Sequence, residues 1–304
     1  MPNYTLGDGE TVKNRLGATS HEALEKAETS FVVGRQLQHV LSPQFPRTFD
    51  RAHLTAIHRH LFQDVYEWAG HTRDEPVQLL DGSVATEPLI RKPGGKPFVI
   101  GTSISTGLDD LAERLRKENY LQGLSRSDFA TRAASVLGEI NGIHAFREGN
   151  GRTQRIFMQE LAESAGHSLE FRVVTKERMI QASIAAHEQG DIGLLRRMMD
   201  EISNPHRVAA LTPAIAFLNS AKFPWNENYL ATMEPGRAED VTLVGVNGAH
   251  FMARTENTIL VGQRKDLPSA DTVSGARIKV FTSPWPDSDN AASTAARPGP
   301  SPGP

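Results

Sequence analysis

The sequence contains no cysteine, which excludes disulfides, thiolate metal sites and a cysteine nucleophile and fits a reducing compartment. It also has no large excess of charge of one sign, because 33 lysines and arginines stand against 36 aspartates and glutamates. The formal net charge of −3 gives no support to wholesale electrostatic binding of nucleic acid or of an anionic membrane. No apolar run approaches the ~20 residues of a membrane helix. The opening MPNYTLGDGE lacks a basic region followed by an apolar stretch, so we expect no classical signal peptide.

What is present is the composition of an ordinary globular chain. The 304 residues are 38% hydrophobic and 23% charged, which is enough apolar material for a core and excludes disorder of the whole chain. The length corresponds to one large domain or two modest ones.

The first two thirds of the chain predict helices. A Thr-x-x-Glu capping box at 19–22 begins the first, whose expected apolar face runs from Leu24 through Phe31 to Leu37. Asp50 caps a second helix, whose apolar stripe continues to Trp68 before Gly70 ends it. Further helices are expected at about 106–120, 126–143, 150–165, 175–190 and 191–204.

Two other regions have a different character. Residues 71–104 are rich in proline and glycine and predict a loop with short extended pieces or a hairpin. After a transition at 205–230, β-leaning runs at 241–244, 251–253, 258–261 and 278–281, with the hairpin signal Asn247-Gly248, predict a small β module. We therefore expect three parts: a helical domain at 1–205, a small β domain at 206–285, and a disordered Pro/Gly/Ala tail or linker at 286–304.

One window, HAFREGNGRTQR from His144 to Arg155, carries the chemistry. Gly149 and Gly151 free the backbone to approach a ligand, and their amides together with the start of the next helix form an anion site. Arg152 lies three residues before Arg155 on that helix, so both guanidiniums point toward roughly the same side. Two such forks beside an amide nest suit a polyphosphate better than a lone carboxylate.

Glu148 and His144 complete the set. A single carboxylate inside a basic nest suggests a cation between it and the phosphates, and Mg²⁺ takes such a mixture of ligands. His144 is the residue of the window that titrates near neutrality, so it is the candidate base. The residues together indicate transfer chemistry at a nucleotide phosphate.

The window matches the signature HxFx[D/E]GNGRxxR at all eight fixed positions, and on this basis the chain resembles the Fic family. The segments LFQDVYEWAG (61–70) and VKNRLGATSHEALEKAE (12–28) are also similar to Fic domains, so the resemblance covers about residues 10–205. The β module resembles the OB-like domain that follows Fic in conjugation-plasmid toxins and type IV secretion effectors. The implied fold is mainly α: a Fic helical bundle with a β-hairpin flap, followed by the small β domain.

The resemblance implies AMP transfer from ATP to a Ser, Thr or Tyr hydroxyl of a protein, with release of pyrophosphate. His144 would deprotonate the hydroxyl, and Glu148 would hold Mg²⁺ against the α- and β-phosphates. Phe146 would anchor the loop in the core, and the 71–104 flap would align the target segment.

The same resemblance implies how the nucleotide is bound. Asn150, with the amides of Gly149 and Gly151, would bind the α-phosphate where charge builds up in the transition state. Arg152 would hold the β-phosphate and Arg155 the γ-phosphate.

The sequence departs from the family at Ala145, where proline is usual, and we expect a looser His144 rather than an inactive one. The family's inhibitory motif [S/T]xxxE[G/N] is missing, because each glutamate followed by Gly or Asn lacks Ser or Thr four residues earlier. These glutamates are Glu118, Glu148, Glu227 and Glu256. Activity is then either unrestrained or controlled by a small antitoxin that supplies the glutamate in trans, which we favour.

Several alternatives stay open. We favour a bacterial toxin that acts on a type II topoisomerase, and the alternative is a secreted effector that acts on small GTPases of a host. A non-catalytic nucleotide-binding protein and transfer of another phosphate-containing group are the remaining readings. Localisation is cytoplasmic, with or without translocation by a type IV secretion system.

Other residues have a plain interpretation beside the functional one. His53, His58 and His60 lack metal-site spacing and are interpreted as solvated or hydrogen-bonded helix residues. Lys92 and Lys96 are either phosphate ligands or solvated lysines. The β module offers few basic and aromatic residues for nucleic acid, and a target-docking role fits equally well.

Overall fold

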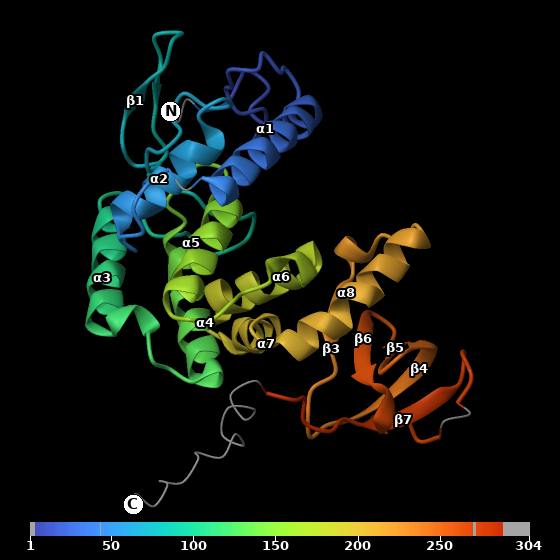
Figure 1. The fold of residues 1–304 in the computed structure, drawn as a ribbon. Coiled ribbons are helices and arrows are strands. Elements are labelled where there is room, and N and C mark those ends of the chain that lie inside the picture. The colour runs from blue at the N-terminus through green and yellow to red at the C-terminus, as the bar shows by residue number, and fades with distance from the viewer. Residues whose placement is uncertain (1–3, 43, 270–271, 288–304) are drawn as a thin grey trace, which may run out of the picture. The chain divides into compact units, whose positions relative to one another are not determined.

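The computed structural model describes residues 4–42, 44–269 and 272–287, and it separates into two compact units. Unit 1 comprises Met1–Gly123, Arg132–Gly166 and Ile184–Ile192, and unit 2 comprises Leu124–Thr131, His167–Ser183 and Gly193–Pro304. Figure 1 shows the helices α1–α8 and the strands β1–β7 in chain order. The described part of the chain has no helix with the length and hydropathy of a membrane span.

Unit 1 is a helical bundle. Its helices are α1 (His21–Leu41), α2 (Arg51–Phe62), α3 (Ser103–Lys117), most of α4 (Arg126–Ile143), and α5 (Asn150–Ser164). Helix α2 packs against both α1 and α5 (Figure 1). The predicted cap of α2 is confirmed, because the Asp50 carboxylate accepts a hydrogen bond from the His53 amide at 2.9 Å. At α1 the capping side chain is Ser20, one residue beyond the expected Thr19.

The buried face of α1 differs from the expected one. Phe31 and Leu37 are 45% and 59% exposed, so their placement in the core was wrong. The buried positions are instead Leu24, Glu28, Val32 and His39. Two of these are polar and bind side chains of α5, described below, so hydropathy alone misorients the helix.

Helix α2 ends at Phe62, earlier than the apolar stripe predicted. Val65, Tyr66 and Trp68 continue the stripe but lie in hydrogen-bonded turns that are fully buried. Trp68 stacks on Tyr66 with ring centroids 4.4 Å apart. Aromatic packing therefore buries these residues without a helix, and Gly70 follows with a φ of 89°.

The region from 71 to 104 contains the expected hairpin. Strands β1 (Val77–Gln78) and β2 (Val84–Ala85) pair antiparallel, and a single bridge joins Arg91 to Pro97. Lys13 donates to the Asp81 carboxylate and to the Ser83 hydroxyl, both at 2.8 Å, which fixes the hairpin turn to the start of the chain. This segment, residues 71–104, is called the flap below.

Unit 2 combines helices with a sheet. Helix α6 (Lys176–Ile184) contributes all but its last residue, and α7 (Gly193–Ile202) and α8 (Pro205–Ser220) follow. Helix α8 lies in the stretch that the sequence predicted as a transition. Asn204-Pro205 ends one helix, but it also starts the next, because Asn204 caps it and Pro205 occupies its first position.

Single helical turns lie at Asn119–Leu121, Phe171–Val173, Trp225–Glu227 and Arg264–Asp266, and a π-helical turn at Ala185–Gln189.

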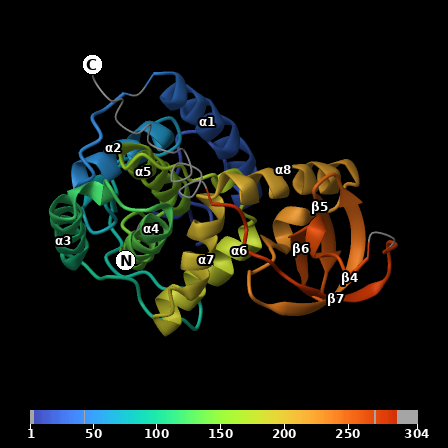
Figure 2. The ribbon, with the colours of Figure 1, turned by 60° about the horizontal axis from the view of Figure 1, so that its bottom comes forward.

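The five-stranded sheet of unit 2 confirms the small β module, with as many strands as an OB-like barrel. Its order is β3-β6-β5-β4-β7, where β3 (Tyr229–Thr232) pairs parallel to β6 (Thr258–Gln263) and the other pairs are antiparallel. Strands β4 (Ala238–Asn247) and β5 (His250–Arg254) meet at the predicted Asn247-Gly248 turn, and β7 is Arg277–Phe281. Figure 2 shows α8 along this sheet, which it contacts at β3 and β6.

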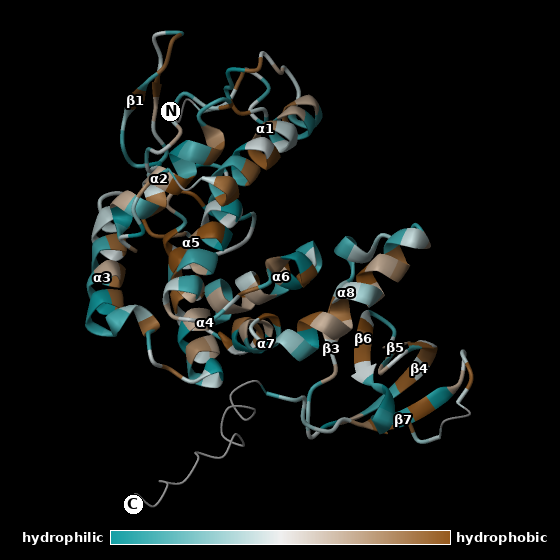
Figure 3. Ribbon diagram, in the orientation of Figure 1, coloured by the Kyte–Doolittle hydropathy of each residue, from teal (hydrophilic) through white to brown (hydrophobic). Residues whose placement is uncertain are grey.

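The core of the sheet is apolar. Its residues, which include the brown segments of β4, β5 and β6 in Figure 3, are Met233, Val241, Leu243, Phe251, Ala253, Leu260 and Val280. Strand β3 escaped the sequence analysis because its four residues show no alternation, three of them being buried.

A buried carboxylate connects the helices of unit 2 to the sheet. Glu201 of α7 binds the guanidiniums of Arg178 on α6 and Arg207 on α8, and it accepts a hydrogen bond from the Thr232 amide on β3 at 2.6 Å. The expected boundary between 205 and 206 stays a prediction. Of the expected tail, Pro286 and Asp287 are described and bind Asn204 and Arg126, and residues 288–304 lie outside the described residues.

Candidate active site

The window that the sequence singled out forms the connection between α4 and α5 in unit 1. His144 follows the last residue of α4 and takes a φ of 50°, which is unusual for a residue with a side chain. Gly149 precedes α5 with a φ of 82°. A Cβ on Gly149 would lie 2.4 Å from the Phe62 ring, so glycine is required there for both backbone and space.

Asn150 closes this loop. Its side-chain oxygen accepts from the Phe146 amide at 3.0 Å, and its side-chain nitrogen donates to the Phe146 carbonyl at 2.7 Å. Phe146 is buried, as the resemblance implied, and stacks on His58 of α2 with centroids 3.9 Å apart. By contrast, a Cβ on Gly151 would meet open space, so the first turn of α5 is accessible from outside.

The His144 side chain is partly buried beside the flap. Burial, assisted by the positive charges of Lys92 and Arg73, lowers its pKa to about 3, against a smaller raising effect of a backbone hydrogen bond to Asn141. The ring stacks on Phe98 of the flap at 4.0 Å and 12°, and Nδ1 has no hydrogen-bond partner among the described residues. The imidazole is therefore neutral at neutral pH and able to accept a proton.

Glu148 is exposed at the mouth of the loop. Its Oε1 lies 3.2 Å from the Gly149 amide nitrogen and 3.9 Å from the Arg152 guanidinium. In the described part of the chain, no group of three or more His, Cys, Asp or Glu side chains has the geometry of a metal site. A lone accessible carboxylate beside an anion-binding loop fits Mg²⁺, which takes one or two carboxylates together with phosphate oxygens and water.

The two arginines of the window have different surroundings. The Arg152 guanidinium forms an ion pair with the buried Glu28 of α1, which also accepts a hydrogen bond from the Tyr66 hydroxyl, and it lies 4.7 Å from the Phe62 ring centroid. No carboxylate of the described residues forms an ion pair with Arg155. Burial, and then Arg152, lower the pKa of Arg155, and its buried Nε has no partner there.

The sequence analysis did not identify the residues that hold the loop in place through hydrogen bonds to its backbone. His58 accepts a hydrogen bond from the Gly70 amide at 2.8 Å and donates to the Glu148 carbonyl at 3.1 Å. Burial lowers the pKa of His58 to about 3, so this imidazole is neutral. His53, His58 and His60 are all buried and hydrogen-bonded, so the solvated alternative was wrong. Only the partners, which are distant in sequence, reveal these roles.

The end of the flap is fixed by the π-helical turn. The Glu188 carboxylate accepts from the Lys96 amide at 3.0 Å, and Lys96 Nζ donates to the Glu188 carbonyl at 2.7 Å. His187 stacks on the other face of Phe98 at 4.4 Å. Lys96 is thus exposed, as the solvated alternative has it, and hydrogen-bonded to Glu188, whereas the exposed Lys92 acts on His144 through its charge.

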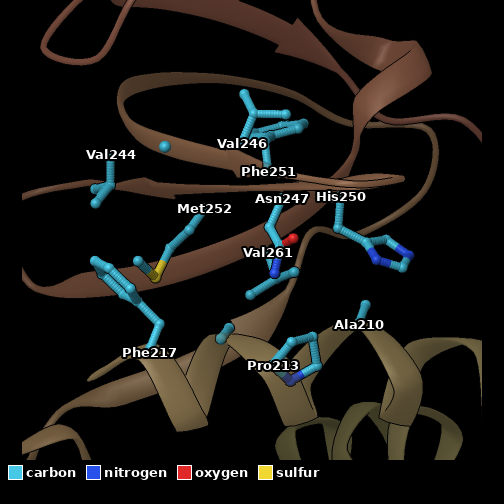
Figure 4. Close-up of a pocket in the computed structure, with 12 residues that line it drawn as sticks. Ala210, Pro213, Phe217, Val244, Val246, Asn247, His250, Phe251, Met252 and Val261 are labelled. Carbon is cyan, nitrogen blue, oxygen red and sulfur yellow. The ribbon is translucent and has the colours of Figure 1, made fainter. Parts of the chain in front are cut away.

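Two of the cavities in the described part of the chain bear on the flap and on the sheet. One in unit 1, of about 650 Å³, is bounded by the flap at Phe98, by Ile143 and by α3. The other, in unit 2, has about 290 Å³ between α8 and the sheet, and Figure 4 shows Pro213 and Phe217 facing Met252 and Val261 across it.

Comparison with known proteins shows the family of the chain. Residues 48–162 match the Fic/DOC family. A protein adenylyltransferase of Bartonella henselae is 34% identical over 268 residues, which are 88% of this chain and 49% of that protein. The chain thus spans about half the length of this curated relative.

Two solved structures are also similar. The type IV secretion system effector protein BepA has a TM-score of 0.87 at 32% identity, over 93% of this chain and 96% of that one. The N-terminal Fic domain of a VirB-translocated effector of Bartonella quintana, with bound ADP, has a TM-score of 0.63 at 40% identity, over 66% of this chain and 94% of that one. The chain therefore belongs to the Fic/DOC family.

Proposed function

We propose that the chain is a protein adenylyltransferase that moves AMP from ATP to a hydroxyl of another protein. The observation that carries this proposal is that the loop before α5 holds a neutral His144 while the first turns of α5 hold an Arg155 without a carboxylate partner in the described residues. The name of the B. henselae relative and the ADP bound to the B. quintana domain support it.

In the proposed reaction His144 takes the proton of the acceptor hydroxyl. The hydroxyl oxygen forms a bond to the α-phosphorus, the bond from that phosphorus to the bridging oxygen breaks, and pyrophosphate leaves with that electron pair. A pKa of about 3 makes an unassisted imidazole a weak base. The negative charge of a bound triphosphate raises the pKa of a nearby imidazole, so substrate binding itself activates His144.

The nucleotide would be bound along the start of α5. The backbone amides of Gly149 and Gly151, with Asn150, would bind the α-phosphate, Arg152 the β-phosphate and Arg155 the γ-phosphate. Glu148 would hold Mg²⁺, which neutralises charge between the phosphates when it is bound.

The absence of proline at position 145 has a structural counterpart. Phe98 and His187 stack in sequence against the His144 ring, so aromatic contacts limit its motion where a proline would stiffen the backbone. We therefore propose that Ala145 is compatible with full catalytic geometry.

We further propose that the protein is an effector of a type IV secretion system rather than a toxin confined to its own cell. The support is the similarity to BepA over 93% of this chain, which includes the β sheet. The target, a type II topoisomerase or a small GTPase, stays a prediction. A small partner protein that supplies a glutamate to Arg155 also stays a prediction, and the unpartnered Nε of Arg155 supports it.

The first prediction concerns the transfer itself. Purified protein with Mg²⁺ should transfer label from α-labelled ATP to a protein of a cell lysate, and the lysate without the purified protein should not show this label. His144→Ala and Glu148→Ala should each reduce incorporation by about 100-fold or more. His21→Ala, at an exposed position of α1, is the matched control and should label as wild type does. Equal labelling by all the variants would contradict the roles of His144 and Glu148, and nucleotide binding without label would favour a non-catalytic protein.

A further inference from the structure

Arg73 is a fully buried guanidinium between the flap and the loop that carries His144. It is 0% exposed, and its side chain donates to backbone carbonyl oxygens of Glu87, Pro88, Val99, Ile143 and His144. The distance from Nε to the His144 oxygen is 2.8 Å, and that from Nη1 to the Pro88 oxygen is 2.5 Å. The Arg73 backbone amide also donates to the Ala145 carbonyl at 2.8 Å.

The partners of Arg73 are unusual for a buried charge. Within the described residues no carboxylate forms an ion pair with it, and every side-chain hydrogen bond ends on a carbonyl. Burial lowers its pKa from the usual value, as expected for a charge without a full counter-charge. Carbonyls at the end of a helix carry partial negative charge and lack intrahelical partners, so the carbonyls of Ile143, the last residue of α4, and of the following His144 supply part of the compensation.

Arg73 restrains the backbone that directly follows the His144 side chain. The carbonyl of His144 accepts from the Arg73 side chain, and the next carbonyl, that of Ala145, accepts from the Arg73 amide. His144 has a φ of 50°, which a residue with a Cβ adopts only when its surroundings hold it there. Because Ala145 leaves its own φ free, these two hydrogen bonds replace a restraint that proline would supply.

The same guanidinium binds both segments of the flap, the one that follows the hairpin and the one that leads to α3. Glu87 and Pro88 lie on the segment that leaves the hairpin, and Val99 lies where the flap returns toward α3. Phe98, next to Val99, contacts the His144 ring. Movement of the flap relative to the loop would therefore break hydrogen bonds to a charge that has no alternative partner.

We propose that Arg73 is a positioning residue that locks the flap and the His144 loop into one arrangement through its planar fork. The inference rests on the proposed function, because its kinetic consequence requires that His144 be the base and that the flap align the acceptor. Arg73 acts through backbone atoms of these segments and contacts neither Arg152 nor Arg155. Its loss should therefore affect the acceptor side of the reaction and spare nucleotide binding.

The second prediction is the effect of Arg73→Lys. Lysine keeps the charge but cannot donate in five directions from a rigid plane. Label transfer from α-labelled ATP should fall about 10- to 100-fold, and the lysate concentration that gives half-maximal rate should rise. The ATP concentration that gives half-maximal rate should change by less than about threefold. Arg178→Lys, which alters an equally buried fork in unit 2, is the matched control and should lower thermal stability without this kinetic pattern.

Hydrogen exchange gives a readout that does not depend on activity. In Arg73→Lys, residues 86–100 and 143–146 should exchange faster together, while α5 keeps its protection. Lys13→Met, which releases only the hairpin turn at Asp81 and Ser83, should leave 143–146 unchanged. If Arg73→Lys does not fold, the wild-type chain still provides the test, because the two segments should then show the same protection and the same dependence on denaturant.

The outcomes separate the two proposals. Absence of label with the wild-type chain would remove the proposed function, yet coupled exchange of the two segments would still support the lock. Independent exchange of the two segments, or a proportional loss of ATP binding and transfer in Arg73→Lys, would overturn the role of Arg73.

Discussion

At the residue scale, the two arginines of the α5 start differ in how their charge is compensated. Arg152 is paired with Glu28, a carboxylate 124 residues away in the chain and itself buried. Arg155 is partly buried with a buried Nε and no ion pair in the described residues, and an uncompensated charge of this kind opposes folding. An uncompensated charge on a helix whose start is accessible is typical of a binding site, because a ligand supplies the missing charge.

The third prediction compares Arg155→Met with Arg152→Met in the absence of nucleotide. Arg155→Met should leave the unfolding free energy unchanged or raise it, because an uncompensated charge is removed and its volume is kept. Arg152→Met should lower it by about 1–3 kcal/mol, because Glu28 is left without its partner. Urea titrations followed by circular dichroism measure both values.

Binding should follow a different order from stability. Isothermal titration should show ATP affinity reduced about 10- to 100-fold in Arg155→Met, with AMP affinity nearly unchanged if this residue holds the γ-phosphate. A marked loss of stability in Arg155→Met would mean that the guanidinium has a structural partner, and would argue against the γ-phosphate role.

At the element scale, local patterns predicted most helices and the hairpin. They did not predict which helix faces are buried, because that depends on polar contacts between residues far apart in the sequence. The caps at Ser20 and Asp50 and the Asn247-Gly248 turn are local features, and the sequence located each within one residue. The buried face of α1 could not be predicted, because Glu28 and His39 are buried by partners on α5. Among the site residues, the window 144–155 was visible as a contiguous motif.

The supports of that window were not visible. His58 and Arg73 bind backbone carbonyls of the loop. Every residue type has a backbone carbonyl, so the sequence does not indicate which residues are their partners. The turn after α2 illustrates the same limit, since Trp68 kept the helical apolar spacing although the helix had ended at Phe62.

The fourth prediction tests the support that α2 gives to the loop. His58→Phe keeps a ring to stack on Phe146 but leaves the Gly70 amide and the Glu148 carbonyl without partners. Stability should fall by about 1–3 kcal/mol. Transfer should fall by about tenfold even under conditions where the variant is fully folded, because the backbone of Glu148 is released.

His60→Phe is the matched control for His58→Phe, because the His60 ring donates to the Arg35 carbonyl at 2.9 Å and not to a carbonyl of the loop. It should lose stability with little change in transfer. Equal losses of transfer in both variants would contradict a specific role of His58. The measurements are denaturant titration and label incorporation on the same samples.

At the scale of the whole molecule, each compact unit has its own buried carboxylate. In unit 1, Glu160 of α5 accepts hydrogen bonds from His39 on α1 at 2.8 Å and from His53 on α2 at 2.7 Å. In unit 2, Glu201 joins three helices to β3. Although burial alone raises the pKa of Glu160, the two histidines lower it to about 2.

The fifth prediction uses these two carboxylates as reporters. Glu160→Gln should cost about 3 kcal/mol near neutral pH, and Glu201→Gln about 3–5 kcal/mol because two buried guanidiniums lose their counter-charge. Hydrogen exchange should rise in the unit that carries the substitution. A similar rise in both units after either substitution would show that they unfold as one body.

The pH dependence of the Glu160 contribution has a definite sign. A carboxyl whose pKa is lowered from 4.5 to about 2 by folding stabilises the protein above pH 4.5. That stabilisation is lost as the pH falls from 4.5 toward 2, so wild type and Glu160→Gln should converge in stability over this interval. A difference that persists at pH 2 would contradict the assignment.

The lowered pKa values of the His58 and His144 imidazoles have a practical consequence. His58 and His144 both remain uncharged well into the acid range, so neither gains or loses a proton when buffer conditions shift between mild acid and mild alkali. A titration of the nucleotide-free protein over that interval should therefore detect no ionisation of these rings. An ionisation that is detected only when the triphosphate is bound is then assigned to His144, whose pKa the triphosphate raises.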